Sequence, residues 1–141
     1  MGNVEYFPVA FGATDLDLPF SEAVRVGPLL YLSGAIGIDA SGALVPGGIE
    51  AETRQALANI RAVLERHGSS LDRVIKCTVM LLDMAEWQAM NRVYREHFPA
   101  NLPARSALGA SGLALGARIE LECIATIEPV ISQRPASLAR G

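Results

Sequence analysis

The stretch from Arg118 to Glu128 constrains the fold most, because apolar and mostly polar positions alternate along it. Successive side chains of a β-strand point to opposite faces of the sheet, so this alternation predicts a strand with one buried face and one charged face. The predicted buried face consists of five residues: Ile119, Leu121, Cys123, Ala125 and Ile127. The opposite face carries the carboxylates of Glu120 and Glu122.

Residues 104–109 precede this strand and are joined to it by a linker that contains Gly and Ser. We expect the two segments to form an antiparallel hairpin about Gly112 and Leu113. Such a hairpin places Arg105 directly opposite Glu120, with Cβ atoms roughly 5 Å apart. The planar guanidinium of Arg makes two parallel hydrogen bonds to a carboxylate. The pair is therefore either a cross-strand salt bridge or part of a site for a small molecule.

Length and charge narrow the class of protein. A chain of 141 residues, of which 50% are hydrophobic, has the usual size of a single globular domain. The net charge of -3 and the lack of a basic stripe argue against a general nucleic-acid binder. No stretch approaches the roughly 20 apolar residues that cross a bilayer, and no secretory pattern begins the chain. We therefore expect a cytoplasmic protein with small-molecule partners.

Periodicity predicts two helices, over residues 49–67 and 83–98, between segments with strand character. Gly68 lies where a left-handed C-cap belongs, and Asp83 carries the N-cap signal of the second helix. The order strand, helix, strand, helix, strand makes two crossover units, which favour parallel neighbours, and terminal hairpins add antiparallel pairs. We therefore predict an α+β fold in which both helices pack on one face of a mixed β-sheet.

The other face of that sheet has no spare element to cover it, which predicts association of chains through the sheet. We expect residues 1–129 to form a single domain. Residues 130–141 have no periodic pattern and are expected to form a flexible C-terminal tail.

Further candidate site residues lie outside the predicted hairpin. Ser33 and Gly34 interrupt a long apolar arm, and a Gly inside a strand marks either a bulge or a close approach to the backbone. Ser33, Asn91 and the backbone near Ala107 are candidate hydrogen-bonding groups. Each has a structural alternative, since Ser33 can satisfy a strand edge and Asn91 can be an exposed or capping side chain.

Other reactive residue types have structural interpretations. Cys77 and Cys123 are distant in sequence and lie within predicted strands, which favours buried free thiols over a disulfide or a zinc site. His67 and His97 fall near helix C-termini, where a positive group complements the helix dipole. The sequence contains no phosphate-binding loop, metal-ligand cluster or nucleophile elbow, so we expect chemistry without a cofactor.

Ordered segments to about Pro129 resemble one known family. They are Pro19–Ser21, Leu32–Ile36, Gln55–Ile60, Val74–Val79, Asn91–Phe98, Pro103–Ser106 and Ile119–Glu122. The combination of Pro-Ala-Arg-Ser with Ile-Glu-x-Glu is the hallmark of the reactive intermediate deaminases, the Rid or YjgF family. The resemblance implies a chorismate-mutase-like α+β fold assembled as a homotrimer, with a site in each cleft between subunits.

In that family the Arg that matches Arg105 binds the carboxylate of a 2-imino or 2-enamino acid, which water hydrolyses to a 2-oxo acid and ammonia. The Glu that matches Glu120 positions the water, and Glu122 is the competing choice. Two substrate-site positions depart from the family pattern. Phe20 replaces the usual Tyr, Ala107 replaces a common Cys, and both changes bear on substrate preference.

The leading hypothesis is an enzyme that acts on C=N bonds, a deaminase like the 2-iminobutanoate/2-iminopropanoate deaminases, with substrates such as 2-aminoacrylate. One alternative is a sister catabolic hydrolase for another carboxylate-bearing imine. Another is a non-enzymatic trimer that binds small carboxylates or unfolded chains. Retention of Glu120 together with Arg105 favours an enzyme, because carboxylate binding alone does not need the Glu. The acidic balance and the lack of a His-based acid/base pair disfavour a ribonuclease.

Overall fold

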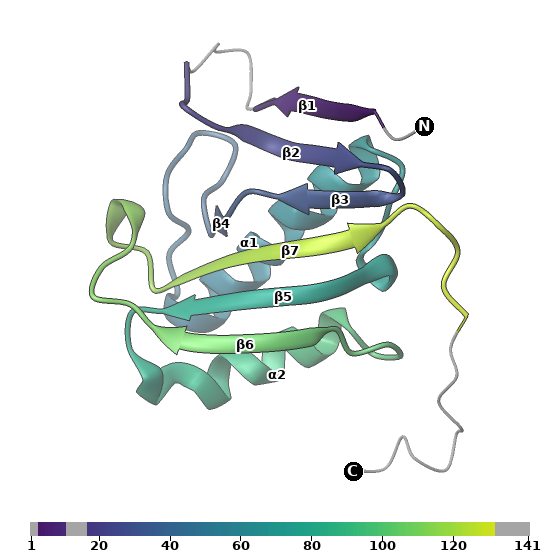
Figure 1. The fold of residues 1–141 in the computed structure, drawn as a ribbon. Coiled ribbons are helices and arrows are strands. Elements are labelled where there is room, and N and C mark those ends of the chain that lie inside the picture. The colour runs from purple at the N-terminus through teal and green to yellow at the C-terminus, as the bar shows by residue number, and fades with distance from the viewer. Residues whose placement is uncertain (1–2, 11–16, 132–141) are drawn as a thin grey trace, which may run out of the picture.

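The computed structural model describes residues 3–10 and 17–131, and Figure 1 shows its fold. Within these residues one seven-stranded sheet is accompanied by helices α1 (Gly48–Arg66) and α2 (Trp87–His97). The strands are β1 (Val4–Pro8), β2 (Ser21–Val26), β3 (Leu29–Leu32), β4 (Ala35–Ile36), β5 (Val74–Leu81), β6 (Ala104–Gly109) and β7 (Ile119–Thr126). The predicted α+β fold with a mixed sheet is confirmed. Most of the predicted tail, 130–141, lies outside the described residues.

β7 lies inside the sheet and not in a C-terminal hairpin. The strand order is β1-β2-β3-β7-β5-β6, and β4 also pairs with β7. β5 is antiparallel to β7 and parallel to β6, so the predicted antiparallel pairing of residues 104–109 with β7 is wrong. The physical reason is burial, because the inner side chains of β7 are at most 3% exposed. A position between two other strands removes such apolar side chains from water more fully than an edge position does.

The two helices that were predicted as crossovers connect different kinds of strand pair. α2 connects β5 to β6, which are parallel neighbours as expected. α1 connects β4 to β5, but both of these strands pair antiparallel with β7, which lies between them. Only one of the two crossovers therefore ends beside the strand from which it started.

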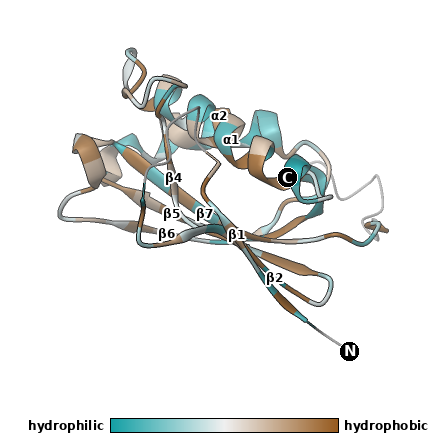
Figure 2. Cartoon of the chain, turned by 90° about the horizontal axis from the view of Figure 1, so that it is seen from above, coloured by the Kyte–Doolittle hydropathy of each residue, from teal (hydrophilic) through white to brown (hydrophobic). Residues whose placement is uncertain are grey.

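Both helices pack on the same face of the sheet, as the edge-on view in Figure 2 shows. The core between the helices and the sheet includes Leu57 and Ile60 of α1, each at most 1% exposed. Burial of a side chain of this size contributes about 1.5–3 kcal/mol.

At the end of α1, Gly68 has a φ of 81°, as predicted. The Asp83 side chain accepts a hydrogen bond from the Ala85 N–H, but it caps a 3-10 turn over Met84–Glu86. The second helix begins at Trp87, so its predicted start at residue 83 is wrong.

No helix in the described part of the chain covers the opposite face of the sheet (Figure 2). Cross-strand pairing places Tyr6, Val24, Tyr31 and Ile124 in one row on this open face. Tyr6 is 71% exposed and Tyr31 is 43% exposed. A contiguous exposed apolar surface of this kind is typical of an association surface.

Candidate active site

Arg105 lies on the edge strand β6, with its side chain on the helix-covered face of the sheet. It pairs with Cys77, which is 1% exposed. The guanidinium carbon lies 4.7 Å from the ring centroid of Tyr94 and 5.9 Å from that of Trp87, and Nη1 lies 3.9 Å from the Met90 sulfur. Among the described residues, no carboxylate forms an ion pair with Arg105. The intrachain salt bridge considered as a structural alternative is therefore not formed there.

Glu120 lies on the open face of the sheet, where it pairs with Met80 of β5 and Ile36 of β4. Its carboxylate rests against the backbone of Gly34, since a Cβ added there would stand 2.6 Å from Oε1. Any side chain at this position would displace the carboxylate, so Gly permits the close approach. Glu122, the competing carboxylate, is exposed, whereas Glu120 is partly buried.

Arg105 and Glu120 do not meet within one chain. β5 separates β6 from β7, and the two side chains belong to opposite faces of the sheet. The expected Cβ separation of roughly 5 Å is therefore wrong, since it assumed direct pairing of their strands. Alternation indicates which residues of one strand share a face, but it does not specify the neighbouring strand.

Asn91 and Ala107 lie on the same side of the sheet as Arg105. Ala107 pairs with Val79 and packs against the core. Asn91 lies on α2, and its Oδ1 is buried without a hydrogen-bond donor among the described residues. A buried acceptor without a donor costs about 1–3 kcal/mol. Such an unpaired amide is more typical of a binding site than of a hydrophobic core, where buried polar groups are hydrogen-bonded.

Phe20 directly precedes β2 and Ser33 directly follows β3, so both lie at the open end of the β2–β3 hairpin. The side chain of Phe20 is 50% exposed. Ser33 Oγ donates a hydrogen bond of 2.5 Å to the Ser21 carbonyl oxygen, and the Ser33 N–H donates one of 3.1 Å to the Glu22 carbonyl oxygen. These bonds fasten the segment after Phe20 beside Gly34. Ser33 therefore positions this segment, while its hydroxyl oxygen still has acceptor capacity.

The candidate site residues thus fall into two groups. The Arg105 group consists of Arg105, Asn91 and Ala107, from β6 and α2. The Glu120 group consists of Phe20, Ser33, Gly34 and Glu120, from the segments around β2, β3, β4 and β7.

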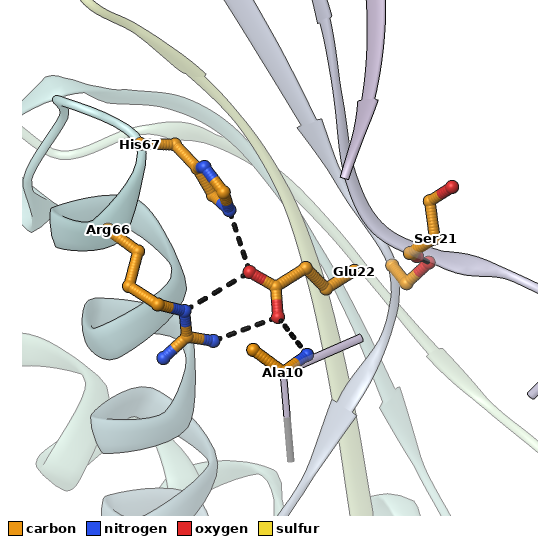
Figure 3. A network of polar contacts seen from close by, with 6 residues as sticks. Ala10, Ser21, Glu22, Arg66 and His67 are labelled. Atoms are coloured by element: carbon orange, nitrogen blue, oxygen red, sulfur yellow. Dashed lines mark hydrogen bonds and ion pairs between the residues drawn. The ribbon is translucent and has the colours of Figure 1, made fainter. Parts of the chain in front are cut away.

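Sequence patterns do not reveal the ionic network at the end of α1 that Figure 3 shows. The Glu22 carboxylate accepts hydrogen bonds from Arg66 Nε and Nη2 at 3.2 and 2.9 Å, from His67 Nε2 at 2.7 Å and from the Ala10 N–H at 2.9 Å. Its side chain is 6% exposed. Burial by itself raises the pKa of Glu22, but the bonds from Arg66, Ala10 and His67 outweigh burial and hold the pKa below its ordinary value. The available sequence signal was an acidic residue at the start of an apolar strand.

The remaining candidates have structural roles. His97 Nδ1 donates a 2.9 Å hydrogen bond to the Val93 carbonyl oxygen within α2. Cys77 and Cys123 pair across β5 and β7 as free thiols, as predicted, and burial raises the pKa of both. The described residues contain no group of three or more His, Cys, Asp or Glu side chains able to hold a metal ion.

The chain shares both sequence and fold with known proteins. Residues 13–127 match the family model described as Endoribonuclease L-PSP. The 2-iminobutanoate/2-iminopropanoate deaminase of Mus musculus is 42% identical over 114 residues, which are 80% of this chain and 84% of the mouse protein. The Arabidopsis thaliana protein named Reactive Intermediate Deaminase A, chloroplastic, is 38% identical over 126 residues, which are 89% of this chain and 64% of the plant protein.

A solved structure agrees with these relationships. The crystal structure of RidA from an Antarctic Psychrobacter species matches with a TM-score of 0.79 and 31% identity, over 87% of this chain and 99% of that one. The chain therefore belongs to the Endoribonuclease L-PSP family, which is the Rid or YjgF family.

Proposed function

We propose that this protein is a cofactor-independent deaminase that hydrolyses 2-imino and 2-enamino acids to 2-oxo acids and ammonia. The observation that carries the proposal is the half-buried Arg105 guanidinium, which has no carboxylate partner among the described residues. Such a cation binds an external carboxylate without first breaking an ion pair. The name of the mouse relative specifies 2-iminobutanoate and 2-iminopropanoate, and both carry a carboxylate beside the C=N bond.

The reaction needs a carboxylate anchor and an activated water. In this proposal Arg105 holds the substrate carboxylate, and Glu120 accepts a proton from water as the water oxygen attacks the imine carbon. Glu120 then passes this proton to nitrogen, which gives a carbinolamine. The hydroxyl proton of the carbinolamine moves to the same nitrogen as the C–N bond breaks, so that ammonia leaves as the C=O bond forms. An enamine substrate first takes a proton on carbon to become the imine. Water is the only co-substrate, so the atoms and electrons balance without a cofactor.

Arg105 and Glu120 lie on opposite faces of the sheet, so a site that contains both requires two copies of the chain. We propose that one copy supplies the Arg105 group and its neighbour supplies the Glu120 group. A contact to which the two copies contribute different groups is head-to-tail, and such contacts form a ring when the rotation between copies closes. The family resemblance implies a homotrimer, and the apolar open face offers a surface for its assembly.

The family description also includes the word endoribonuclease, which the histidines do not support. The chain contains two His residues. His67 is bonded to Glu22, and His97 is bonded to the Val93 carbonyl of its own helix. Neither is available as part of the acid/base pair that general acid–base cleavage of RNA commonly uses. The net charge of -3 also disfavours binding to phosphates.

Two further features belong to the proposal. No helix of the described residues is long and apolar enough to cross a membrane. Cys77 and Cys123 are buried free thiols that pair across two strands. The cytoplasmic location expected from the sequence remains a proposal.

The activity is tested with imines that an amino-acid oxidase generates in the assay from alanine, leucine or methionine. We expect formation of the 2-oxo acid to accelerate in proportion to the concentration of this protein, above the spontaneous hydrolysis measured without it. Rates equal to the spontaneous rate for all three imines contradict the proposed function.

The assembly is tested by light scattering of the active protein. We expect a mass about three times the 15.0 kDa of one chain. A fully active monomer at micromolar concentration contradicts a site shared between copies.

A further inference from the structure

The surroundings of Arg105 are supplied by one stripe of α2. Trp87, Met90 and Tyr94 follow one another at spacings of three and four residues, which places their side chains on one face of the helix. All three contact the Arg105 guanidinium. Their exposure differs, since Met90 is 0%, Tyr94 is 4% and Trp87 is 39% exposed.

The aromatic rings and the thioether leave the N–H groups of Arg105 nearly free to bind a carboxylate, because only Nη1 has a partner among them, the Met90 sulfur at 3.9 Å. An aromatic ring attracts the guanidinium through its π-face, and the Met90 thioether is only a weak acceptor. A carboxylate in the same place would occupy the N–H fork of Arg105 and compete with the substrate. The rings also remove water from the cation, which strengthens any charge-assisted hydrogen bond that it then makes.

We propose that Tyr94 and Trp87 are positioning residues that act through Arg105, setting how tightly it binds the carboxylate common to all substrates. This inference rests on the proposed function, because it assigns the substrate carboxylate to Arg105. Tyr94 forms the inner wall, and its ring packs against that of Phe98 with the centroids 4.7 Å apart. Trp87 forms the outer wall, at the solvent side of the guanidinium.

Trp87 also provides a direct probe, because it is the single tryptophan of the chain. Its indole lies 5.9 Å from the guanidinium carbon, so occupation of Arg105 by a carboxylate changes the surroundings of the only indole fluorophore. The probe is 2-oxobutanoate, a product of the proposed reaction. We expect saturable changes in Trp87 emission in the wild-type protein, and none in Arg105→Ala.

Kinetics separate positioning from other roles. Trp87→Leu should raise KM about 3- to 5-fold and change kcat by less than about twofold, whereas Trp87→Phe should stay within about twofold of wild type in both. The factor in KM should be the same for imines of alanine and leucine, because Arg105 contacts the shared carboxylate. A factor that follows side-chain size, or a fall in kcat with unchanged KM, overturns the inference.

Tyr94 gives the second comparison. Tyr94→Phe keeps the ring and should bind 2-oxobutanoate within about twofold of wild type, while Tyr94→Leu should bind about tenfold more weakly. Because Tyr94 is buried, folding of the Leu variant is checked by circular dichroism. If it does not fold, Trp87→Leu decides the question alone. Equal binding by folded Tyr94→Leu and wild type overturns the inference.

The fluorescence titration separates failure of this inference from failure of the proposed function. In one outcome the protein releases no 2-oxo acid above background, but it binds 2-oxobutanoate through Arg105, and this binding weakens in Tyr94→Leu. The deaminase assignment is then wrong and the positioning role stands. An active protein whose Trp87 emission is unaffected by saturating 2-oxobutanoate keeps the assignment, and the positioning role is wrong.

Discussion

Arg105 and Glu22 are both charged residues in mostly apolar surroundings, but their partners differ. The Glu22 carboxylate is 6% exposed and accepts four hydrogen bonds from Arg66, His67 and Ala10. Arg105 has two aromatic rings and a thioether beside it, and no carboxylate among the described residues. A paired buried charge supports the fold, whereas removal of a charge from water without a counterion costs stability. The Glu22 network and the candidate site therefore differ in whether the charge has a counterion, more than in how deeply the charge is buried.

The largest expected effect is on catalysis by Arg105→Ala. Loss of the carboxylate anchor should lower kcat/KM about 10³-fold, which corresponds to about 4 kcal/mol. The melting temperature should change little, because no described ion pair is lost. Steady-state kinetics and thermal denaturation measure the two quantities.

Arg54→Ala is the matched control, since it removes an Arg of α1 that forms an exposed ion pair with Glu96 at 3.3 Å. Such a pair contributes less than about 1 kcal/mol, and activity should be retained. Substantial residual activity in Arg105→Ala shows that Arg105 is not a site residue. The distinction between an unpaired charge that binds substrate and the paired charge of Glu22 is then wrong.

The opposite outcome is expected for Glu22→Gln. Loss of the charge leaves Arg66 and His67 without their carboxylate, and the free energy of unfolding should fall by about 3 kcal/mol at neutral pH. Chemical denaturation measures this change, with Glu50→Gln as the control because the Glu50 side chain is 46% exposed in its pair with Arg92. A change below 1 kcal/mol contradicts the structural role of the network.

The pH dependence sharpens the same test. The folded pKa of Glu22 lies below its ordinary value of 4.5, so the ionised carboxylate stabilises the fold fully above that value. This contribution is lost as the pH falls through the folded pKa. The difference in unfolding free energy between wild type and Glu22→Gln should therefore shrink as the pH falls below about 4.5. A difference that does not shrink below pH 4.5 contradicts this assignment.

A smaller effect is expected for Glu120→Gln, which should lower kcat about 10²-fold with little change in KM. Glu122→Gln is the matched control on the same strand and face, and it should stay within about twofold of wild type. Equal losses in the two variants, measured by steady-state kinetics, show that Glu120 is not the residue that handles water.

Gly34→Ala tests how the backbone seats that carboxylate. The new Cβ would stand 2.6 Å from Glu120 Oε1, so the flexible end of Glu120 must move. We expect kcat to fall about tenfold, which corresponds to about 1.4 kcal/mol, with a smaller loss of stability. Kinetics of the variant decide this, and an unchanged kcat shows that the position of Glu120 is unimportant.

The smallest effect is expected for Phe20→Tyr. In the proposed site Phe20 supplies an apolar wall, and such walls discriminate by only about 1–3 kcal/mol per methylene. Wild type should accept the larger imines of leucine and methionine comparatively well, and the Tyr variant should shift the preference towards the imine of alanine. If both rates and their order stay unchanged, Phe20 is a packing residue outside the site.

Local patterns were sufficient for several elements. The helix predicted over residues 49–67 is observed as Gly48–Arg66, because helical spacing and a Gly C-cap act within a few residues of each other. The inner face of β7 was also predicted correctly. The Glu22 network was not, since it joins residues 44 positions apart and no local pattern pairs a strand carboxylate with the end of a later helix.

By itself the sequence determined the two helices, the buried face of β7 and the presence of an Arg and a Glu suited to binding a carboxylate and handling water. Only the tertiary structure decided that β5 separates β6 from β7, which places Arg105 and Glu120 on opposite faces of the sheet. The physical reason is that side-chain alternation is a property of one strand. The choice of neighbouring strand depends on which arrangement buries the most apolar surface across the whole chain.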